Sequence, residues 1–301
     1  MQIGIIGLGR MGLNMTKRLL LDKHEVYVFD LYKKSLESAT KIGAKPTNSI
    51  RKLIKSLEKP STIWVMVPSG ETTENVIEEL IRELKAGDFI IDGGNSYYKD
   101  TIRRSEKTKK LNINYLDCGT SGGIWGLENG YCLTIGGEKE SYLHNLPIFK
   151  TLSPKESNGN LYVGKSGSGH FVKMIHNGIE YGMMQSIAEG FEILDAKKEF
   201  NLDLYSISKN WEKGSVIESW LLEITSSELE DKSIEHLSSS VEDSGEGRWT
   251  LKESIDLGIP IPAISASLFS RFRSRQKEPI SGKILSAMRR GFGGHKTGKN
   301  K

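Results

Sequence analysis

QIGIIGLGRMG, residues 2–12, joins a short apolar run directly to a glycine-rich turn. Gly7, Gly9 and Gly12 have the spacing GxGxxG, in which the first glycine makes a tight turn and the second lets the backbone approach a ligand. The third lets the following helix pack closely, so that its first amides face an anion such as a pyrophosphate. The stretch therefore predicts a strand, a helix and, between them, a dinucleotide-binding loop made of Gly7, Leu8, Gly9, Arg10, Met11 and Gly12.

A second predicted strand supports this interpretation. EVYVFD ends in Asp30, 18 residues after Gly12 (30 − 12). An acid at this place accepts hydrogen bonds from ribose hydroxyls and repels the 2′-phosphate of NADP. We therefore expect NAD to be the preferred cofactor. Lys33 and Lys34 follow closely and weaken the repulsion, so NADP stays possible.

The first half of the chain alternates strand-like and helix-like patterns. Helical patterns lie near 10–21, 33–42, 48–57, 72–84 and 99–110. The alternation predicts a Rossmann-type α/β domain with a doubly wound, mainly parallel sheet. The apolar runs expected as strands are QIGIIG, EVYVFD, TIWVMV, DFIIDG, INYLDC and YCLTIG.

The segment 153–169 is rich in glycine and serine, which is typical of a domain boundary. After it, long helical periodicities continue to about residue 290, with breaks near Gly245 and at Pro260 and Pro262. The second domain is therefore expected to be all-α. The predicted domains are a dinucleotide-binding domain (1–166), a helical substrate and dimerisation domain (167–290) and a basic tail (291–301).

Composition limits the class of protein. Of the 301 residues, 37% are hydrophobic and 27% are charged, which allows a packed core. No run approaches the ~18 apolar residues of a membrane span. Cys118 and Cys132 are the only cysteines and make no metal-ligand cluster with histidines, so we expect a cytoplasmic protein without a bound metal. The net charge of +4 is concentrated in a tail that lacks aromatic residues suited to nucleic acid, so we expect no nucleic-acid or membrane partner.

A polar stripe follows the boundary. In GSGHFVKMIHNGIEY (167–181), Lys173, His176, Asn177 and Glu180 stand at i, i+3, i+4 and i+7 of a predicted helix, within an arc of roughly 100°. Such a face can hand protons to and from one substrate. The alternative is an amphipathic helix with a solvated face, because most polar stripes are only solvated.

Further motifs extend over essentially the whole chain. They are IDGGNSYYKDTIRR (91–104), DCGTSGG (117–123), GHFVKMIHNGIEYG (169–182), GEGRWT (245–250), GIPIPAI (258–264), FSRFRS (269–274) and RRGFGGH (289–295). Together the motifs resemble those of the decarboxylating 6-phosphogluconate dehydrogenases, in the short form with a single helical unit.

The resemblance implies oxidative decarboxylation of 6-phosphogluconate to ribulose 5-phosphate and CO2, with hydride transfer to NAD(P). Lys173 would be the base that takes the hydroxyl proton, and as an ammonium it would polarise the ketone, so no metal is required. Glu180 would protonate the carbon that loses CO2. His176 and Asn177 would position the substrate.

The resemblance also implies the binding residues. Val67, Pro68 and Asn95 complete the cofactor site. Arg289 and His295 match a tail that reaches a neighbouring subunit, which implies a homodimer or homotetramer with a shared active site, although a frayed basic tail is the alternative. The substrate-binding residues would be Asn95, Ser121, Gly122, Gly123, Tyr181, Arg271, Arg289 and His295.

Two departures and two alternatives remain. A lysine of the long form is Ser244 here, and its KW pair is Arg248-Trp249, so one phosphate contact is missing from the pattern. A β-hydroxyacid dehydrogenase of the 3-hydroxyisobutyrate or tartronate type shares the glycine loop and the lysine but normally lacks the glutamate at position 180. A nucleotide-sensing protein without catalysis would keep the fold and usually lose the Lys173–Glu180 pair.

Overall fold

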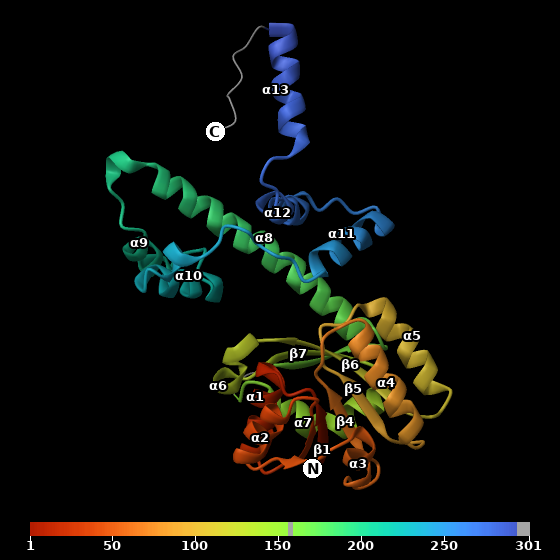
Figure 1. Cartoon of the computed structure of the whole chain (residues 1–301). Helices are drawn as coiled ribbons and strands as arrows, with labels where there is room; N and C mark the ends of the chain where they lie inside the picture. The colour runs from red at the N-terminus through yellow and green to blue at the C-terminus, as the bar shows by residue number, and fades with distance from the viewer. Residues whose placement is uncertain (156–158, 294–301) are drawn as a thin grey trace. The chain divides into compact units, whose positions relative to one another are not determined.

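The structure, a computed structural model, describes residues 1–155 and 159–293. The chain divides into two compact units, Met1–His176 and Asn177–Lys301. Helix α8 (Ser168–Ala196) begins in the first unit and continues into the second (Figure 1). No helix of the described residues is long and apolar enough to cross a membrane.

The described part of the first unit contains one eight-stranded sheet with the order β3-β2-β1-β4-β5-β6-β7-β8. Neighbouring strands are parallel except for β6 and β7. The first six positions have the Rossmann order, so the predicted fold class is confirmed. The strands are β1 (Gln2–Ile6), β2 (Glu25–Phe29), β3 (Lys45–Pro46), β4 (Thr62–Val65), β5 (Phe89–Asp92), β6 (Asn114–Ser121), β7 (Cys132–Gly136) and β8 (Asn160–Gly164).

Helices cover both faces of this sheet (Figure 1). One apolar core includes Met15 and Leu19 of α1 and Phe149 of α7, and the other includes Leu53 of α3 and Leu80 of α4. The central strands β1 and β4 are buried on both sides, which explains their nearly continuous apolar sequence. The helices are α1 (Arg10–Leu21), α2 (Lys33–Lys41), α3 (Ile50–Lys55), α4 (Glu71–Glu83), α5 (Tyr98–Lys109), α6 (Gly126–Asn129) and α7 (Lys139–Leu152).

Four elements of this unit were absent from the prediction, one of which is the four-residue helix α6. Strand β3 has two residues, and edge strand β8 lies within the Gly/Ser-rich segment that we interpreted as a boundary. Helix α7 contains Pro147, which obscures its periodicity. The six strands and five helices expected from the sequence are all present, with ends that differ by a few residues.

The second unit is helical in its described part, as predicted. Side chains of Asp203 and Ser219 cap two of its helices, and Pro262 opens a third. Helix α13 continues to Gly293, beyond the residue where the tail was expected to start. After α8 the helices are α9 (Leu204–Trp211), α10 (Trp220–Glu230), α11 (Glu246–Leu257), α12 (Pro262–Ser274) and α13 (Ile280–Gly293).

The first turn of α8 lies directly on the backbone of β6 and β7. A Cβ atom on Gly169 would lie 2.6 Å from the carbonyl oxygen of Thr134, and one on Gly119 would lie 2.5 Å from Cβ of Lys173. Neither neighbour is the free end of a flexible side chain. The helix therefore approaches the sheet as closely as these glycines allow.

We predict that Gly119→Ala lowers the free energy of unfolding by about 1–3 kcal/mol, because the new methyl group must push α8 away from β6. Denaturant unfolding followed by circular dichroism measures the change. Gly190→Ala is the control, since a Cβ atom there meets nothing within 4 Å and alanine favours a helix. Equal losses in the two variants would contradict the close packing of α8.

Candidate active site

The glycine loop between β1 and α1 has the geometry of a phosphate cradle. Gly7 has φ +94°, and a Cβ atom on Gly12 would lie 2.0 Å from the carbonyl oxygen of Gly7. A Cβ atom on Gly9 would meet nothing within 4 Å, so this side of the loop is open. Gly7 and Gly12 are thus needed to avoid strain or a clash within the loop itself. Gly9 has open space beside it and leaves room for a ligand.

The start of α1 is available to an anion. Gly9 is its N-cap, no side chain caps it and its first turn has no acidic residue. The exposed Arg10 and the half-buried Met11 follow in the first turn. Unsatisfied amides and the helix dipole favour a phosphate at this end. These residues therefore fit the pyrophosphate of a dinucleotide.

Asp30 lies at the end of β2 and holds the glycine loop. Its Oδ2 accepts a hydrogen bond from the amide of Leu8 at 2.6 Å, and its Oδ1 accepts one from the amide of Tyr32 at 2.8 Å. A carboxylate has about four acceptor positions, so it can still accept from two ribose hydroxyls. The arrangement suits the unphosphorylated ribose of NAD.

The other predicted cofactor residues also follow the carboxyl ends of parallel strands. Val67 and Pro68 come after β4, and the exposed Asn95 comes after β5. The loop with Asn95 is held by the buried Asp92, which accepts hydrogen bonds from the amide of Gly94 at 3.3 Å and from Oγ of Ser96 at 2.9 Å. Ligands of open α/β sheets bind at this edge.

The strand β6 and the start of α8 bring three predicted residues together. Oγ of Ser121 lies 3.3 Å from Nε2 of His176, and Nδ1 of His176 lies 3.3 Å from Nζ of Lys173. Gly122 and Gly123 follow Ser121 with φ angles of +129° and +53°. A hydroxyl, an imidazole and an amine thus form a continuous hydrogen-bonded chain.

Alternate residues of β6 hold the first turns of α8. Asp117 is fully buried and accepts hydrogen bonds from the amides of Gly167 at 2.7 Å and His170 at 2.9 Å. Burial raises the pKa of Asp117, and the charge of His170 and the two amides act against that rise. Because strand residues alternate between faces, Asp117, Gly119 and Ser121 point to the same side. Asp117 binds the start of the helix, Gly119 makes room beneath Lys173 and Ser121 contacts His176.

Asn177 and Glu180 lie further along the same helix, in the second unit. Asn177 is buried and Glu180 is partly exposed. The helix predicted for Lys173, His176, Asn177 and Glu180 is confirmed, since all four lie in α8. The apolar positions beside them are not all covered. Ile179 and Met183 are 52% and 43% exposed and border a cavity of about 510 Å³ in this unit.

Two residues expected to bind the substrate phosphate are in contact within the second unit. The guanidinium of Arg271 lies 3.6 Å from the ring centroid of Tyr181 and donates to the carbonyl oxygen of Glu242 at 2.8 Å. The Tyr181 hydroxyl accepts from the amide of Ser244 at 3.4 Å, and burial raises the pKa of this phenol. Stacking leaves other guanidinium N–H groups able to bind an anion.

Charged neighbours of this pair were missed by the sequence reasoning. Asp243 accepts hydrogen bonds from Arg248 at 2.7 Å and from Arg275 at 3.0 Å. Glu246, at the start of α11, is 4% exposed, and its charge contributes to the raised pKa of Tyr181. The i, i+4 spacing of Arg271 and Arg275 was the available signal, since it places the C-cap residue Arg275 on the same face as Arg271 of α12.

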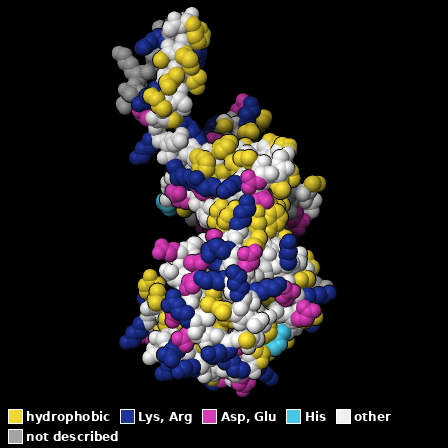
Figure 2. Space-filling model, turned by 90° about the vertical axis from the view of Figure 1, so that its right-hand side faces the viewer, with side chains coloured by type: hydrophobic (Ala, Val, Ile, Leu, Met, Phe, Trp, Pro, Cys, Tyr) yellow, Lys and Arg dark blue, Asp and Glu magenta, His cyan; other side chains and the backbone are white. Residues whose placement is uncertain are grey.

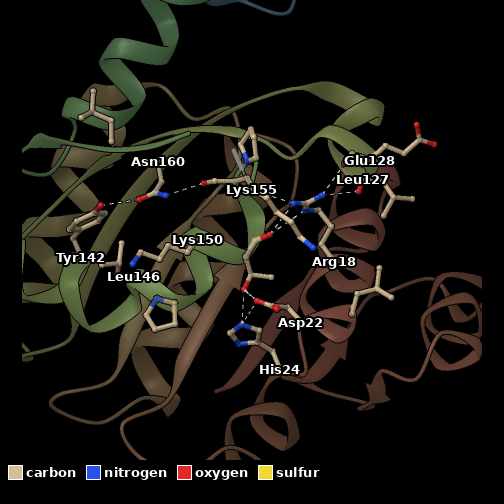
Figure 3. Close-up of a pocket in the computed structure, with 16 residues that line it drawn as sticks. Arg18, Asp22, His24, Leu127, Glu128, Tyr142, Leu146, Lys150, Lys155 and Asn160 are labelled. Carbon is tan, nitrogen blue, oxygen red and sulfur yellow. Dashed lines mark hydrogen bonds and ion pairs between the residues drawn. The ribbon is translucent and has the colours of Figure 1, made fainter. Parts of the chain in front are cut away.

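The last two predicted residues belong to the C-terminal part of the chain. Arg289 is exposed on α13, and His295 lies outside the described residues. A cavity of about 1030 Å³ in the first unit is bordered by the last turn of α1 and by α7, at the opposite end of α1 from the glycine loop (Figure 3). Among residues 1–155 and 159–293 no three His, Cys, Asp or Glu side chains are grouped to hold a metal ion.

Comparisons with known proteins agree with this geometry. A family model described as the NAD binding domain of 6-phosphogluconate dehydrogenase matches residues 2–164. A second model, described as the C-terminal domain of 6-phosphogluconate dehydrogenase, matches residues 169–296. The chain is 39% identical to an NAD⁺-dependent, decarboxylating 6-phosphogluconate dehydrogenase of Haloferax volcanii, over 99% of both chains. It is 41% identical, over 99% of this chain and 100% of the other, to a Bacillus subtilis protein provisionally named as a 6-phosphogluconate dehydrogenase.

A solved structure of 6-phosphogluconate dehydrogenase from Plasmodium falciparum has a TM-score of 0.83 and 29% identity to this chain. The match covers 97% of this chain and 65% of that one, so the chain spans just under two thirds of this longer relative. With both family models matched in order and two relatives aligned over their full length, the chain belongs to the 6-phosphogluconate dehydrogenase family.

Proposed function

We propose that this chain oxidises and decarboxylates 6-phosphogluconate to ribulose 5-phosphate and CO2, with NAD as hydride acceptor. The hydrogen-bonded chain Ser121–His176–Lys173 carries the proposal. It lies in the same unit as the glycine loop, whose geometry fits the pyrophosphate of NAD. Family membership supplies the substrate class.

When bound, NAD supplies the acceptor for the hydride that leaves C3 of the sugar acid. Neutral Lys173 takes the proton of the C3 hydroxyl, which leaves a 3-keto acid. The resulting ammonium donates to the C3 oxygen while the C1–C2 bond breaks, so the bond electrons enter an enediol and CO2 departs. Glu180 then protonates the carbon that lost CO2, and Lys173 takes back the enol proton.

His176 and Asn177 hold the substrate in this proposal. The contact between Nδ1 of His176 and Nζ of Lys173, at 3.3 Å, orients the amine. Ser121, Gly122 and Gly123, here called the substrate loop, bind its carboxylate and hydroxyls, and Asn95 lies between substrate and cofactor.

We predict that the purified protein forms NADH and CO2 in equal amounts from 6-phosphogluconate. Lys173→Ala should reduce kcat by about a thousandfold or more, and Glu180→Gln by about a hundredfold, within the range of general acid–base catalysis. In pre-steady-state experiments with substrate in excess, Glu180→Gln should keep a burst of NADH, because its step follows hydride transfer. Lys173→Ala should lose the burst.

Lys165→Ala and Glu189→Gln are the controls, since both residues are exposed and lie outside the stripe. NADH without CO2 would favour the β-hydroxyacid dehydrogenase alternative. Tight NADH binding without turnover would favour the non-catalytic one. Comparing kcat/KM for gluconate with that for 6-phosphogluconate measures how much the phosphate contributes to substrate recognition in a chain that has Ser244 in place of a lysine.

The cofactor preference depends on Asp30. We predict that kcat/KM is higher with NAD than with NADP, and that Asp30→Ser shifts the ratio toward NADP by at least about tenfold, because a like charge beside the 2′-phosphate is removed. Glu37→Gln, which changes an exposed acid on α2, is the control. A wild-type preference for NADP would contradict the role of Asp30.

We also propose that Tyr181 and Arg271 bind the substrate phosphate, together with Arg289 and His295 from a neighbouring subunit. The functional domains would be 1–166 and 167–290 with the tail 291–301. We place the protein in the cytoplasm, in keeping with its free Cys118 and Cys132.

The shared site requires a homodimer or homotetramer. Helix α13 carries an exposed apolar stripe at i, i+4, i+8 and i+12, and hydrophobic atoms gather along it in Figure 2. Large exposed apolar stripes mark association surfaces. Its members are Ile280, Ile284, Met288 and Phe292, which are 69%, 50%, 50% and 80% exposed.

We predict that Ile284→Glu combined with Met288→Glu converts the protein to monomers and lowers kcat/KM at least about tenfold, because charges on the stripe prevent association. Sedimentation and activity are measured on the same samples. Ser286→Glu, on another face of α13, should change neither. A fully active monomer would contradict the shared site.

A further inference from the structure

The guanidinium of Arg18, in the last turn of α1, is bound by main-chain carbonyls from two other segments (Figure 3). Its Nη1 donates to α6 and its Nη2 to the end of α7. An arginine presents five N–H donors in a planar fork, which suits several carbonyls at once. The acceptors are the carbonyl oxygens of Leu127 (2.9 Å), Glu128 (3.4 Å), Thr151 (3.1 Å) and Ser153 (3.0 Å).

The two halves of this arrangement have different consequences. Thr151 lies in the last turn of α7 and Ser153 is its C-cap, where carbonyls lack partners within the helix and a cation is favourable. That half stabilises the fold. Leu127 and Glu128 lie in α6, a few residues after the substrate loop, so the other half reaches toward the candidate site.

Asn14 acts beside Arg18 on the same helix face, four residues earlier. Its Nδ2 donates to the carbonyl oxygen of Ile124 at 3.0 Å. One face of α1 therefore binds the beginning and the end of the segment 124–128. These main-chain bonds do not depend on which side chains the segment carries.

The buried ring of Tyr131 connects this segment to the substrate loop. A Cβ atom on Gly126 would lie 2.0 Å from this ring, and one on Gly122 would lie 3.4 Å from it. Burial raises the pKa of Tyr131 to about 12, so the phenol stays neutral beneath the loop. The segment thus closes around a fixed ring, and Gly122 rests against the same ring.

We propose that Arg18 is a positioning residue, which with Asn14 holds the substrate loop in its binding conformation by fastening α6 to α1. The glycine loop precedes the start of α1, so one rigid helix fixes the positions of the glycine loop and the substrate loop relative to each other. The inference rests on the proposed function for its kinetic readout but not for its structural one.

The test compares Arg18→Ala, Arg18→Lys and Asn14→Ala with the control Lys17→Ala, which removes a charge from an exposed neighbour. Loss of the Arg18 guanidinium and its hydrogen bonds should raise KM for 6-phosphogluconate by about ten- to a hundredfold in Arg18→Ala. The Kd of NADH, measured by fluorescence, should stay within about twofold. Asn14→Ala should show a smaller change in the same direction, and added guanidinium should partly restore Arg18→Ala.

Hydrogen exchange supplies the structural readout. Amides of 122–130 should exchange faster in Arg18→Ala and Asn14→Ala, while those of the glycine loop stay unchanged. Wild-type KM together with wild-type exchange in a folded Arg18→Ala would overturn the proposal, and so would parallel losses of substrate and NADH affinity. If Arg18→Ala does not fold, Arg18→Lys and Asn14→Ala decide by the same criteria. If the wild type does not oxidise 6-phosphogluconate, the proposed function fails while hydrogen exchange still tests Arg18.

Discussion

The candidate site depends on the buried carboxylate of Asp117 and on the strand face that it shares. Burying a carboxylate is costly unless it is hydrogen-bonded, and here the amide of Gly167, just before α8, and that of His170, in its first turn, supply the two bonds. The positive end of the helix dipole lies at the same place. Gly119 and Ser121 follow Asp117 on the same face of β6. The hydrogen bonds of Asp117 to the start of α8 therefore also set how far Lys173 and His176 lie from the sheet.

A second buried carboxylate serves the neighbouring strand. Asp92 pairs in register with Asp117 and accepts from the Tyr115 hydroxyl at 2.9 Å as well as from the loop that carries Asn95. Arg104, 1% exposed, lies 3.5 Å from it and also binds Glu74. Arg104 is thus a buried ionic partner of the Asp92 carboxylate. The ends of two adjacent strands thus hold the loop with Asn95 and the start of α8 at one edge of the sheet.

The sequence predicted those features that repeat a local rule. The glycine spacing, the strand ending at Asp30 and the helical stripe each follow from short-range geometry, and the structure contains all three elements. Strand β8 was missed because it lies within a segment rich in glycine and serine, which is typical of a boundary, whereas the structure orders it by pairing with β7. The network around Asp243 and the acceptors of Arg18 depend on which segments meet, and a backbone carbonyl leaves no signature in the sequence.

In the proposed mechanism, Lys173 as base and Glu180 as acid must reach a single substrate from one helix. Lys173 and Glu180 are seven residues apart, a rise of about 10.5 Å, whereas the atoms that they would serve are two bonds apart along the sugar chain. Helical side chains lean toward the N-terminus, which brings Glu180 toward Lys173 but carries Lys173 away. His176 lies one turn further on and contacts Nζ of Lys173 at 3.3 Å, so it draws the amine back along the helix. Ser121 in turn holds the far nitrogen of that imidazole, and in this way the strand determines where the lysine points.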